Sequence, residues 1–509
     1  MNIAQWLYAS ALTHPHAPAL FLGTQHWANY QTFAKQASQL GHWLQQQHKI
    51  QQGDRVAIYA PNCVEYLSIL YGCWWIGAVT VPVNPMLHPQ EAAWIADNAQ
   101  ATLIFTDSGT RFTADQLPAS CQELAIRDTI TTLAANGDTL TPPQQLEPDA
   151  LAWLFYTSGT TGRPKGVMLS HANLMAMALC YGTDVDKVES HHATVYAAPM
   201  SHGAGLYNFM YVRAAARHII PESSRFNSGE ILDLAKHHRH VSLFAAPTMC
   251  KRLVNTAQEA GVTGEGFHTI VLGGGPMYSA DLREAMETLG PCFAQIYGQG
   301  ESPMTITAIS ATTLNEREHP NWQARLESVG TAQSCMQIRV VDQNLNDLPA
   351  GSHGEVLAKG PAVMLGYWRN PEATADTLVN GWLRTGDIGF INEEGYLTLT
   401  DRAKDVVISG GSNVYPREVE EVLISHPEIF EAAVVGAPSE EWGEEVVAFI
   451  VCQSNTTLNP QTLDAWCLSQ MASYKKPKRY FFVDELKKNS YGKILKTELR
   501  KQLRERSEL

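Results

Sequence analysis

The sequence predicts an α/β protein with at least two domains, and three observations lead to this prediction. A chain of 509 residues is too long for a single hydrophobic core. Its first 400 residues alternate between short apolar segments typical of buried strands and longer segments with helical spacing. From about residue 337 the pattern changes to short strands separated by turns, and a compact βα segment of about a hundred residues ends the chain.

Predicted strands and helices alternate through the first part of the chain. The strand-like segments are residues 55–59, 78–82, 101–105, 193–198, 240–245 and 269–272. A helix is expected over Cys63–Trp75, between the first two of these strands. The proline pair at 142–143 marks a loop before the apolar segment Leu151–Phe155. Strands regularly separated by helices indicate layered, largely parallel sheets.

The later part of the chain is expected to form a β-rich subdomain followed by a small α+β domain. Short strands are predicted at residues 338–342, 354–358 and 395–399. The charged segment Asp401–Asp405 then lies between two apolar strands, and Val406–Glu420 combines a strand, a glycine turn and a helix that begins at proline. We therefore predict a large N-terminal domain at residues 1–400, a hinge at 401–405 and a C-terminal domain at 406–509.

Composition and charge disfavour several classes of protein. With 45% hydrophobic and 17% charged residues, the chain has the composition of a soluble globular enzyme. Its formal net charge of −14 disfavours nucleic acid as a partner. The N-terminus lacks a basic segment followed by a long apolar core, so no secretory signal is expected. The most apolar stretch, Tyr66–Val83, is interrupted by glycine and proline, so no integral membrane segment is expected.

The cysteine pattern indicates the cellular compartment, and the basic C-terminal region indicates the kind of ligand. None of the nine cysteines forms a C-x-x-C pair, which favours a reduced cytoplasmic protein without structural zinc. Ten lysines and arginines lie between Lys475 and Lys501. A basic terminal region on an acidic protein suggests an anionic ligand such as a nucleotide phosphate. A solvated helix face explains most of these residues, taken singly, equally well.

The strongest motif is the segment Tyr156–Gly166, which reads YTSGTTGRPKG and directly follows an apolar strand. Its glycines let the backbone approach an anion, and its backbone N–H groups, its hydroxyls and the ammonium of Lys165 converge on one small volume. This chemistry predicts a polyphosphate-binding loop. It is not a Walker-type loop, because Lys165 is followed by glycine where that motif has serine or threonine.

Three further motifs place glycine-rich turns beside apolar segments. In Tyr297–Pro303, the carboxylate of Glu301 is suited to holding Mg²⁺ against phosphates. The glycines at 273–275 allow the backbone to approach a flat ligand, although alone they would indicate only a tight turn. In Gly381–Gly389, Asp387 can accept hydrogen bonds from two neighbouring ribose hydroxyls, although acidic turn residues are more often simply solvated.

Two more segments join these four motifs: the strand, glycine turn and helix at Val406–Glu420, and the basic segment Asn489–Lys496, which reads NSYGKILK. The six motifs follow in order from Tyr156 to Lys496, and together they resemble the signatures of the adenylate-forming superfamily. This superfamily includes acyl-CoA synthetases, luciferases and the adenylation domains of peptide synthetases. The resemblance covers most of the chain and implies a mobile C-terminal domain, with ATP, Mg²⁺ and CoA as cofactors. One position departs from the pattern: the superfamily usually has threonine before the glutamate, where this chain has Gly300, so backbone or water must replace a hydroxyl.

The resemblance also implies roles for individual residues. ATP and AMP would be bound by glycines, hydroxyls and charged side chains: Thr157, Ser158, Gly159, Thr160, Thr161, Gly162, Lys165, Gly274, Gly275, Pro276, Tyr297, Gly298, Gln299, Asp387 and Arg402. Lys493, Glu301 and His202 would be catalytic, with Glu301 also holding the metal. CoA would be bound by Ser409, Gly410 and Gly411, and Lys404 would be the hinge residue. The acyl pocket would be formed by His202, Gly203, Gly205, Gly273, Gly300 and Met304.

These assignments predict an AMP-forming carboxylic acid–CoA ligase. Adenylation turns a carboxylate oxygen into part of a leaving group, and a thiol then displaces AMP; both steps need positioning and charge neutralisation above all. The superfamily rotates its small domain between the two steps. Two alternatives stay open: an enzyme that loads a carrier protein, and a non-catalytic acyl-nucleotide sensor. Intact Lys165, Glu301, Asp387 and Lys493 argue against the sensor.

The nature of the acid follows less directly from the sequence. The pocket segments hold small and apolar side chains and no lysine or arginine, so a monocarboxylic acid with an apolar body fits best. We expect a medium or longer fatty acid, with an aryl acid as the alternative. A dicarboxylate stays open if Arg213 reaches inward along the helix after His202. The expected partners are these small molecules, and a homodimer is left open.

Overall fold

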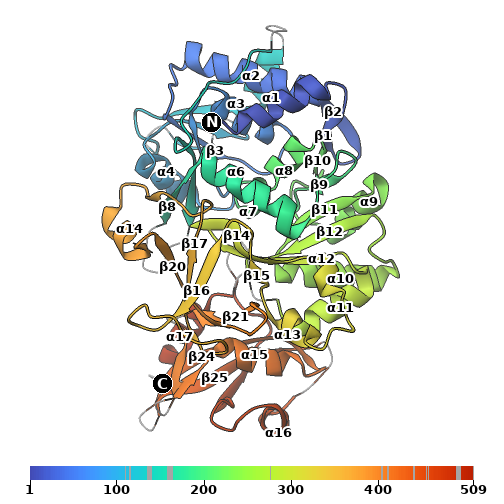
Figure 1. Ribbon diagram of the computed structural model, residues 1–509, viewed down its shortest axis with the longest axis vertical. Helices are drawn as coiled ribbons and strands as arrows, with labels where there is room; N and C mark the ends of the chain where they lie inside the picture. Colours follow the sequence, from blue (N-terminus) through green and yellow to red (C-terminus); the bar gives the residue numbers. More distant parts are fainter. Residues whose placement is uncertain are drawn as a thin grey trace.

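Four β-sheets organise the molecule. The computed structural model describes residues 1–509 apart from 109–110, 114–115, 135–139, 158–163, 276, 403–404, 410–411, 440–441, 454–455, 457, 489–493 and 508–509. Within the described residues the sheets have nine, seven, five and five strands. Figure 1 shows the chain progressing from a large upper part, which contains the N-terminus, to a small lower lobe that contains the C-terminus.

The seven-stranded sheet is built mainly from the first third of the chain. Its strands, in spatial order, are β18 (Gly366–Tyr367), β8 (Lys165–Ser170), β7 (Leu151–Thr157), β4 (Val79–Val83), β3 (Arg55–Tyr59), β5 (Ala101–Thr106) and β6 (Gln122–Ala125). The connecting helices are α2 (Tyr30–Gln47), α3 (Glu65–Trp75), α4 (Pro89–Asn98) and α5 (Ile126–Ala134). The five strands from β7 to β6 run parallel. Every residue of α3 is buried, as its apolar composition on all sides requires.

The nine-stranded sheet carries most of the predicted acid- and nucleotide-binding segments. Its strands, in spatial order, are β15 (Thr331–Ala332), β14 (Ser302–Ile309), β13 (Phe293–Gln299), β12 (Phe267–Leu272), β11 (Val241–Ala245), β9 (Ala193–Val195), β10 (Arg217–Ile220), β1 (Pro18–Leu22) and β2 (Gln25–Asn29). The strands from β13 to β1 run parallel, so their carboxyl ends lie at one edge. The segments after β9, β12 and β13 therefore meet at that edge.

Helices accompany this sheet along the chain. They are α1 (Ala4–Thr13), α6 (His171–Cys180), the π-helix η1 (Tyr181–Val185), α7 (Gly203–Leu206), α8 (Asn208–Arg213), α9 (Ser228–His238), α10 (Pro247–Ala260), α11 (Ser279–Leu289), α12 (Ala311–Leu314) and α13 (Trp322–Glu327). Parallel strands joined through helices confirm the predicted α/β class. In Figure 1, α9, α10 and α11 lie on the right-hand side, beside β11 and β12.

The predicted β-rich subdomain is a five-stranded antiparallel sheet. It contains β16 (Gln337–Val341), β17 (Gly354–Lys359), β20 (Trp382–Ile391), β19 (Leu378–Val379) and β21 (Leu397–Arg402), with α14 (Pro371–Thr377) beside it. Strand β21 extends to Arg402, which pairs with Asp387 of β20. Two residues of the predicted hinge, Asp401 and Arg402, thus belong to this sheet, because the β20–β21 ladder continues through them.

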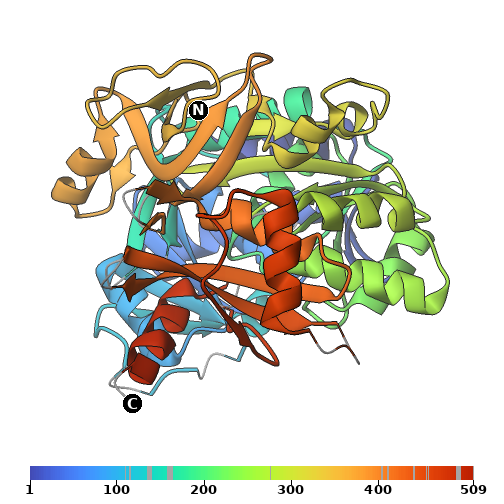
Figure 2. The ribbon, with the colours of Figure 1, turned by 90° about the horizontal axis from the view of Figure 1, so that it is seen from below.

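The small lower lobe has its own sheet and its own cores. Its strands are β23 (Ser412–Val414), β22 (Val407–Ser409), β25 (Gly443–Cys452), β24 (Ile429–Ser439) and β26 (Arg479–Phe482), and its helices are α15 (Pro416–Ile424), α16 (Pro460–Gln470) and α17 (Lys496–Ser507). Leu423 and Leu463 belong to one hydrophobic cluster, and Leu499 and Leu503 to another. Helices thus contribute to both cores of this lobe, which Figure 2 shows in front of the larger part.

Most predicted strands lie within a residue or two of their expected positions, and one is clearly shorter. The strand expected at residues 193–198 ends at Val195. Beyond it, the side-chain amide of Asn62 donates to the carbonyl oxygens of Tyr196 and Ala198, where a neighbouring strand would otherwise bind. A buried side chain therefore ends the strand, and this contact spans more than a hundred residues of sequence.

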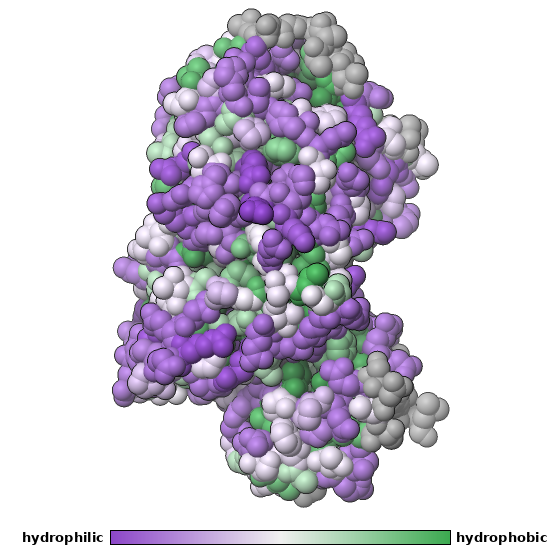
Figure 3. Space-filling view, turned by 90° about the vertical axis from the view of Figure 1, so that its right-hand side faces the viewer, coloured by the Kyte–Doolittle hydropathy of each residue, from purple (hydrophilic) through white to green (hydrophobic). Residues whose placement is uncertain are grey.

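Figure 3 shows a largely hydrophilic face on which hydrophobic atoms are interspersed. Among the helices that the structure describes, none is long and apolar enough to cross a bilayer.

Candidate active site

The predicted polyphosphate loop joins two strands that the structure describes. Strands β7 and β8 form an antiparallel hairpin in which Thr157 pairs with Lys165. Both residues therefore lie at the same end of the hairpin, where the loop begins and ends. Ten predicted site residues lie outside the described residues: Ser158, Gly159, Thr160, Thr161, Gly162, Pro276, Lys404, Gly410, Gly411 and Lys493. Their roles stay predictions.

Glu301 lies in a tight hairpin loop between β13 and β14. Gln299 pairs with Ser302, so that Gly300 and Glu301 form the connection. Before the turn, a Cβ at Gly298 would lie 2.6 Å from the backbone nitrogen of Met304, which leaves room only for glycine. This close packing of backbone holds the half-buried carboxylate of Glu301 beyond the carboxyl end of β13.

A tyrosine that the sequence analysis did not select joins Glu301 to Lys165. The hydroxyl of Tyr367 donates to Oε1 of Glu301 at 2.6 Å, and Nζ of Lys165 lies 4.8 Å from the centroid of the same ring. Tyr367 is held there because β18 pairs with β8, which places Tyr367 opposite Val167. The predicted phosphate-binding lysine and the predicted metal-binding glutamate therefore flank one aromatic ring.

Asp387, in the middle of β20, is the centre of a polar network. Its carboxylate accepts hydrogen bonds from the hydroxyl of Tyr297 at 2.6 Å and from Nε2 of Gln299, and it lies 2.9 Å from Nε of Arg402. The carboxylate of Asp387 raises the pKa of Arg402. Four predicted nucleotide-binding residues from β13, β20 and β21 are thus brought together, with Asp387 itself buried.

Two of the three glycines after β12 are required by the structure, each for a different reason. A Cβ at Gly273 would lie 2.7 Å from Cδ1 of Ile296 and 3.2 Å from Cε2 of Phe244, so side chains already fill that space. Gly274 has φ of +78°, which side chains rarely adopt. Gly275 has ordinary contacts only, the nearest being Pro247 at 3.6 Å. The segment thus follows the carboxyl end of β12 and neighbours Phe244 and Pro247, at the end of β11 and the start of α10.

Two of the predicted acyl-pocket residues, His202 and Gly300, lie against Phe155. The ring of His202 packs on Phe155 with centroids 4.7 Å apart, and a Cβ at Gly300 would lie 3.2 Å from the same ring. Burial lowers the pKa of His202 to about 4, so its imidazole is neutral at physiological pH. A Cβ at Gly205 would collide with the carbonyl oxygen of Met200, which explains why glycine occupies this position of α7.

The remaining pocket and cofactor residues lie as follows. Gly203 begins α7 and has open space where a Cβ would stand. Met304 is buried in β14 with a φ of 57°. Ser409, predicted to bind CoA, is buried in the C-terminal lobe, where it pairs with Ser412 and Gly443. The structure therefore places Ser409 in a different sheet from Asp387 and Glu301.

The C-terminal lobe contacts the larger part through α15. The hydroxyl of Tyr278 donates to Glu420 at 3.0 Å, and the backbone N–H of Ser279 donates to Glu421. Burial is the main cause that raises the pKa of Glu421 to about 7. These contacts lie directly after the glycine segment at 273–275, so the small lobe is packed close to the turn predicted to bind ATP and AMP.

Position 300 shows why this chain departs from the superfamily pattern. A Cβ at Gly300 would collide with Cγ2 of Thr157. The methyl group of Thr157 therefore takes up the space that a threonine at position 300 would need. Thr157 of β7 and Gly300 of the β13–β14 hairpin therefore fit each other in size.

We expect Gly300→Thr, which introduces the superfamily's usual residue, to destabilise the protein by about 1–3 kcal/mol through overpacking. Thermal unfolding followed by circular dichroism would measure the loss. Thr157→Ser/Gly300→Thr removes the colliding methyl group and should recover most of the stability, whereas Thr157→Ser alone serves as the control. An unfolding temperature equal to that of the parent in Gly300→Thr would show that the space is available.

Comparisons with known proteins agree with this geometry. A model of the AMP-binding enzyme family matches residues 7–368, and one of the AMP-binding enzyme C-terminal domain matches residues 418–493. The fatty acid–[acyl-carrier-protein] ligase ScoC of Streptomyces coeruleorubidus is 34% identical over 480 residues, covering 92% of this chain and 91% of that protein. The feruloyl-CoA synthase of Amycolatopsis sp is 32% identical over 501 residues, covering 98% and 99%.

Solved structures give the same result. ATP-bound MatB from Rhodopseudomonas palustris superposes with a TM-score of 0.87 at 29% identity, covering 99% of each chain. The chain therefore belongs to the AMP-binding enzyme family, and the predicted membership of the adenylate-forming superfamily is confirmed. The relatives also confirm the predicted enzyme class, an AMP-forming acid–CoA ligase. One of them is the long-chain-fatty-acid–CoA ligase of Escherichia coli O6:H1, which is 30% identical over 510 residues, covering 91% of this chain and 88% of that protein.

Two residues of the site, Tyr367 and Phe155, were not predicted from the sequence as site residues. Tyr367 lies more than sixty positions after Glu301, and Phe155 was treated only as part of a buried strand. The one available signal was the aromatic pair Tyr367-Trp368 after a glycine, which alone indicates packing as readily as binding. Only the pairing of β18 with β8 gives Tyr367 its place beside Lys165.

Proposed function

We propose that this protein adenylates a carboxylic acid with ATP and then transfers the acyl group to CoA. The network around Asp387 carries the proposal, because it combines a buried carboxylate with a tyrosine, an amide and a guanidinium from segments predicted to bind ATP. A carboxylate held in this way is suited to accepting hydrogen bonds from ribose hydroxyls. Use of ATP is further supported by the likeness to ATP-bound MatB.

The triphosphate would be bound at the end of the β7–β8 hairpin. Lys165 supplies a positive charge there, and Tyr367 fixes its position through the ring face. Glu301 fits a Mg²⁺ ion: one carboxylate oxygen accepts from Tyr367, and the other accepts no hydrogen bond from any residue that the structure describes. Mg²⁺ is commonly held by one or two carboxylates together with substrate phosphates, and it would neutralise charge on them.

The chemistry needs no nucleophilic side chain. In the first step the acid's carboxylate oxygen attacks the α-phosphorus of ATP, forming acyl-AMP while pyrophosphate leaves. Lys493 would neutralise charge at that phosphate. In the second step the CoA thiolate attacks the acyl carbon and AMP leaves. His202, being neutral and packed on Phe155, would shape the acyl side of the site instead of donating a proton at neutral pH.

The two steps would use different arrangements of the small lobe. We assign Lys404 as the hinge, and Ser409, Gly410 and Gly411 as the segment that contacts the pantetheine arm of CoA. The ladder between β20 and β21 supports a pivot after Arg402, because that residue is still fixed by pairing with Asp387. Rotation about one or two backbone torsions could then exchange the groups that face the acyl phosphate.

For the acid, we propose a medium or longer fatty acid. The described pocket residues are small, apolar or neutral, which suits an apolar chain. Relatives named for fatty acids agree, including the carrier-protein ligase and the ligase FadD13 of Mycobacterium tuberculosis, 31% identical over 468 residues with 89% of each protein covered. A dicarboxylate is disfavoured, because Arg213 is exposed and lies over the ring of Trp6.

One observation favours an aryl acid as the second candidate. Tyr207 is buried, and its hydroxyl has no hydrogen-bond partner among the described residues. Its ring lies 5.7 Å from that of Phe244, which in turn lines the space beside Gly273. A ring substituent that hydrogen-bonds with this hydroxyl would satisfy it. The feruloyl-CoA synthase relative is consistent with this candidate.

We expect AMP and pyrophosphate release that depends on both acid and CoA, with fatty acids preferred over aryl acids by at least about tenfold in kcat/KM. The assay compares octanoate, dodecanoate and palmitate with benzoate, 4-hydroxycinnamate and ferulate. A preference for hydroxylated aryl acids that Tyr207→Phe abolishes would select the second candidate. Formation of ADP in place of AMP would reject the proposed function, and acyl transfer to a carrier protein but not to CoA would reject the acceptor.

A further inference from the structure

Histidines gather at the edge of the nine-stranded sheet opposite the candidate active site. His191 and His192 precede β9, and His240 precedes β11, the parallel neighbour of β9. Parallel strands bring their amino ends to one edge, so these residues meet although about fifty positions separate them. His202 lies beyond the other end of β9. The cluster is thus on the far side of the strands from the acyl pocket.

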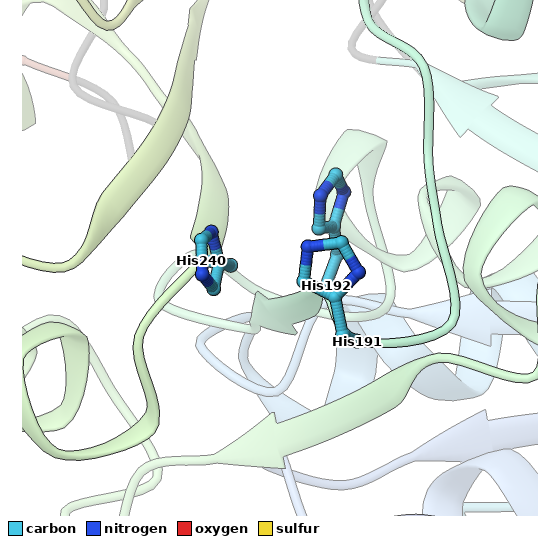
Figure 4. A group of neighbouring side chains, drawn as sticks. All are labelled: His191, His192 and His240. Atoms are coloured by element: carbon cyan, nitrogen blue, oxygen red, sulfur yellow. The ribbon is translucent and has the colours of Figure 1, made fainter.

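The three rings are placed for coordination. One nitrogen of each ring lies within 4.8 Å of one nitrogen of the other two, and Figure 4 shows His240 beside His191 and His192. Three nitrogens bound to one tetrahedral zinc ion lie about 3.3 Å apart, since each Zn–N bond is about 2.0–2.1 Å. His191 and His240 are exposed and can rotate inward by the difference, while His192 is buried and fixed.

The backbone under the cluster is held rigidly. The guanidinium of Arg217 donates to the carbonyl oxygens of His191 and Arg239, which ties the two histidine-bearing segments together. The backbone N–H of Ala193 also donates to the carbonyl oxygen of His240 at 3.0 Å. Arg239 and His240 both have positive φ, of 54° and 53°, which non-glycine residues rarely adopt. The surrounding structure therefore fixes where His240 stands.

The ring chemistry is compatible with a metal. His192 is buried among the described residues, and a neutral imidazole is the form that metals bind. Its Nδ1 accepts the backbone N–H of Glu189 at 3.2 Å, a bond that metal binding at either nitrogen would replace. Glu189 is exposed, so water can satisfy its N–H. The carboxylate of Glu189 also lies 3.7 Å from Nδ1 of His191, where it can orient that ligand.

We propose that His191, His192 and His240 form a binding site for a zinc-type divalent transition metal ion, with water in the fourth position. Three imidazoles suit zinc and its transition-metal neighbours, whereas Mg²⁺ and Ca²⁺ require oxygen ligands. The site is separate from the Mg²⁺ proposed at Glu301. Because it joins the segments before β9 and β11, the bound ion would act as a cross-link that stabilises this edge of the sheet.

Some neighbouring charged groups oppose the binding of a cation at this site, and others favour it. The guanidinium of Arg217 disfavours a cation. His268 packs on His192 with ring centroids 4.0 Å apart, and its Nε2 lies 3.0 Å from Oδ1 of Asp186. The carboxylates of Asp186 and Glu189 offset the positive groups. His268 is already paired with Asp186, and so we assign it to supporting His192 instead of binding the ion.

The first test is direct binding of Zn²⁺. Tag-free protein, freed of metal with a chelator and kept without ATP, is titrated with ZnCl₂ by calorimetry. We expect one saturable site with a dissociation constant in about the micromolar range. His240→Ala and His191→Ala, both at exposed positions, should each weaken binding at least about tenfold. His237→Ala, which removes an exposed histidine from α9, is the matched control and should bind as the parent does.

The second test separates this site from adventitious binding. Co²⁺ in place of Zn²⁺ should give the visible absorption of a four-coordinate nitrogen site in the parent and in His237→Ala, but not in His240→Ala. Zn²⁺ should raise the unfolding temperature of the parent and leave that of His240→Ala unchanged. Equal Zn²⁺ binding by the parent and by both cluster variants, or no saturable binding by the parent, would overturn the proposal.

Discussion

Asp387→Asn is expected to lower the rates of both half-reactions by about 10²-fold. The substitution keeps the shape of the side chain but removes its charge, leaving the guanidinium of Arg402 without its partner at 2.9 Å. The asparagine amide has one acceptor oxygen where the carboxylate has two, so it can accept fewer hydrogen bonds from the ribose hydroxyls. Two weakened hydrogen bonds to a charged group amount to about 3 kcal/mol, which corresponds to about 10²-fold. Since the AMP moiety stays bound throughout, both steps should suffer.

Adenylation is measured by ATP–pyrophosphate exchange, and thioester formation by adding CoA to chemically prepared acyl-AMP. Glu355→Gln is the matched control. Glu355 of β17 forms an ion pair at 2.6 Å with Arg384, which lies in β20 as Asp387 does but outside the Asp387 network. This variant should behave as the parent does. If Asp387→Asn remains folded by circular dichroism and keeps both rates within about threefold, Asp387 does not bind the ribose.

The strands were predictable because each is a local pattern. Residues 55–59 form β3 as expected, since an apolar run bounded by polar turns is decided by its own composition. The early end of β9 was not predictable. It depends on Asn62, whose amide reaches the carbonyl oxygens of Tyr196 and Ala198 across more than a hundred residues. Local composition contains no information about such a contact.

In the candidate site, too, the local motifs were predictable and the contacts between distant segments were not. The motifs at Lys165, Glu301 and Asp387 were recognisable because binding a phosphate, a metal or a ribose demands particular residue types next to glycine. Tyr367 was not recognisable, because its position beside Lys165 results from the pairing of β18 with β8. The packing of Thr157 against Gly300 likewise depends on two hairpins from different sheets.

The histidine cluster shows how sheet topology creates proximity that sequence spacing hides. His191 and His192 are adjacent in sequence, but His240 joins them only because β9 and β11 are neighbours in the sheet while β10 lies on the other side of β9. The absence of C-x-x-C pairs led to the expectation of no structural zinc. That expectation concerned cysteine ligands, and a three-imidazole site would be a different kind of site.

Lys493→Ala is expected to reduce adenylation by about 10²–10³-fold while leaving thioester formation from supplied acyl-AMP within about threefold of the parent. The proposed role of the lysine is to neutralise charge at the α-phosphate while the carboxylate attacks. That charge develops only in the first step. Rotation of the small lobe would then remove Lys493 before the thiol arrives. Asp387→Asn and Lys493→Ala are therefore expected to differ in kind, one affecting both steps and the other a single step.

The lysines of the same tail provide the control for this experiment. Lys496 is held by Glu420 at 2.9 Å and by Asp401 at 3.4 Å, so its loss would disturb the connection between the lobes. Lys487 is exposed, and Lys487→Ala should leave both half-reactions unchanged. Equal losses in both half-reactions for Lys493→Ala would mean that the lysine is structural or that the lobe does not rotate. Unimpaired pyrophosphate exchange would mean that another cation neutralises the α-phosphate, and Arg402, beside Asp387, would be the first residue to substitute.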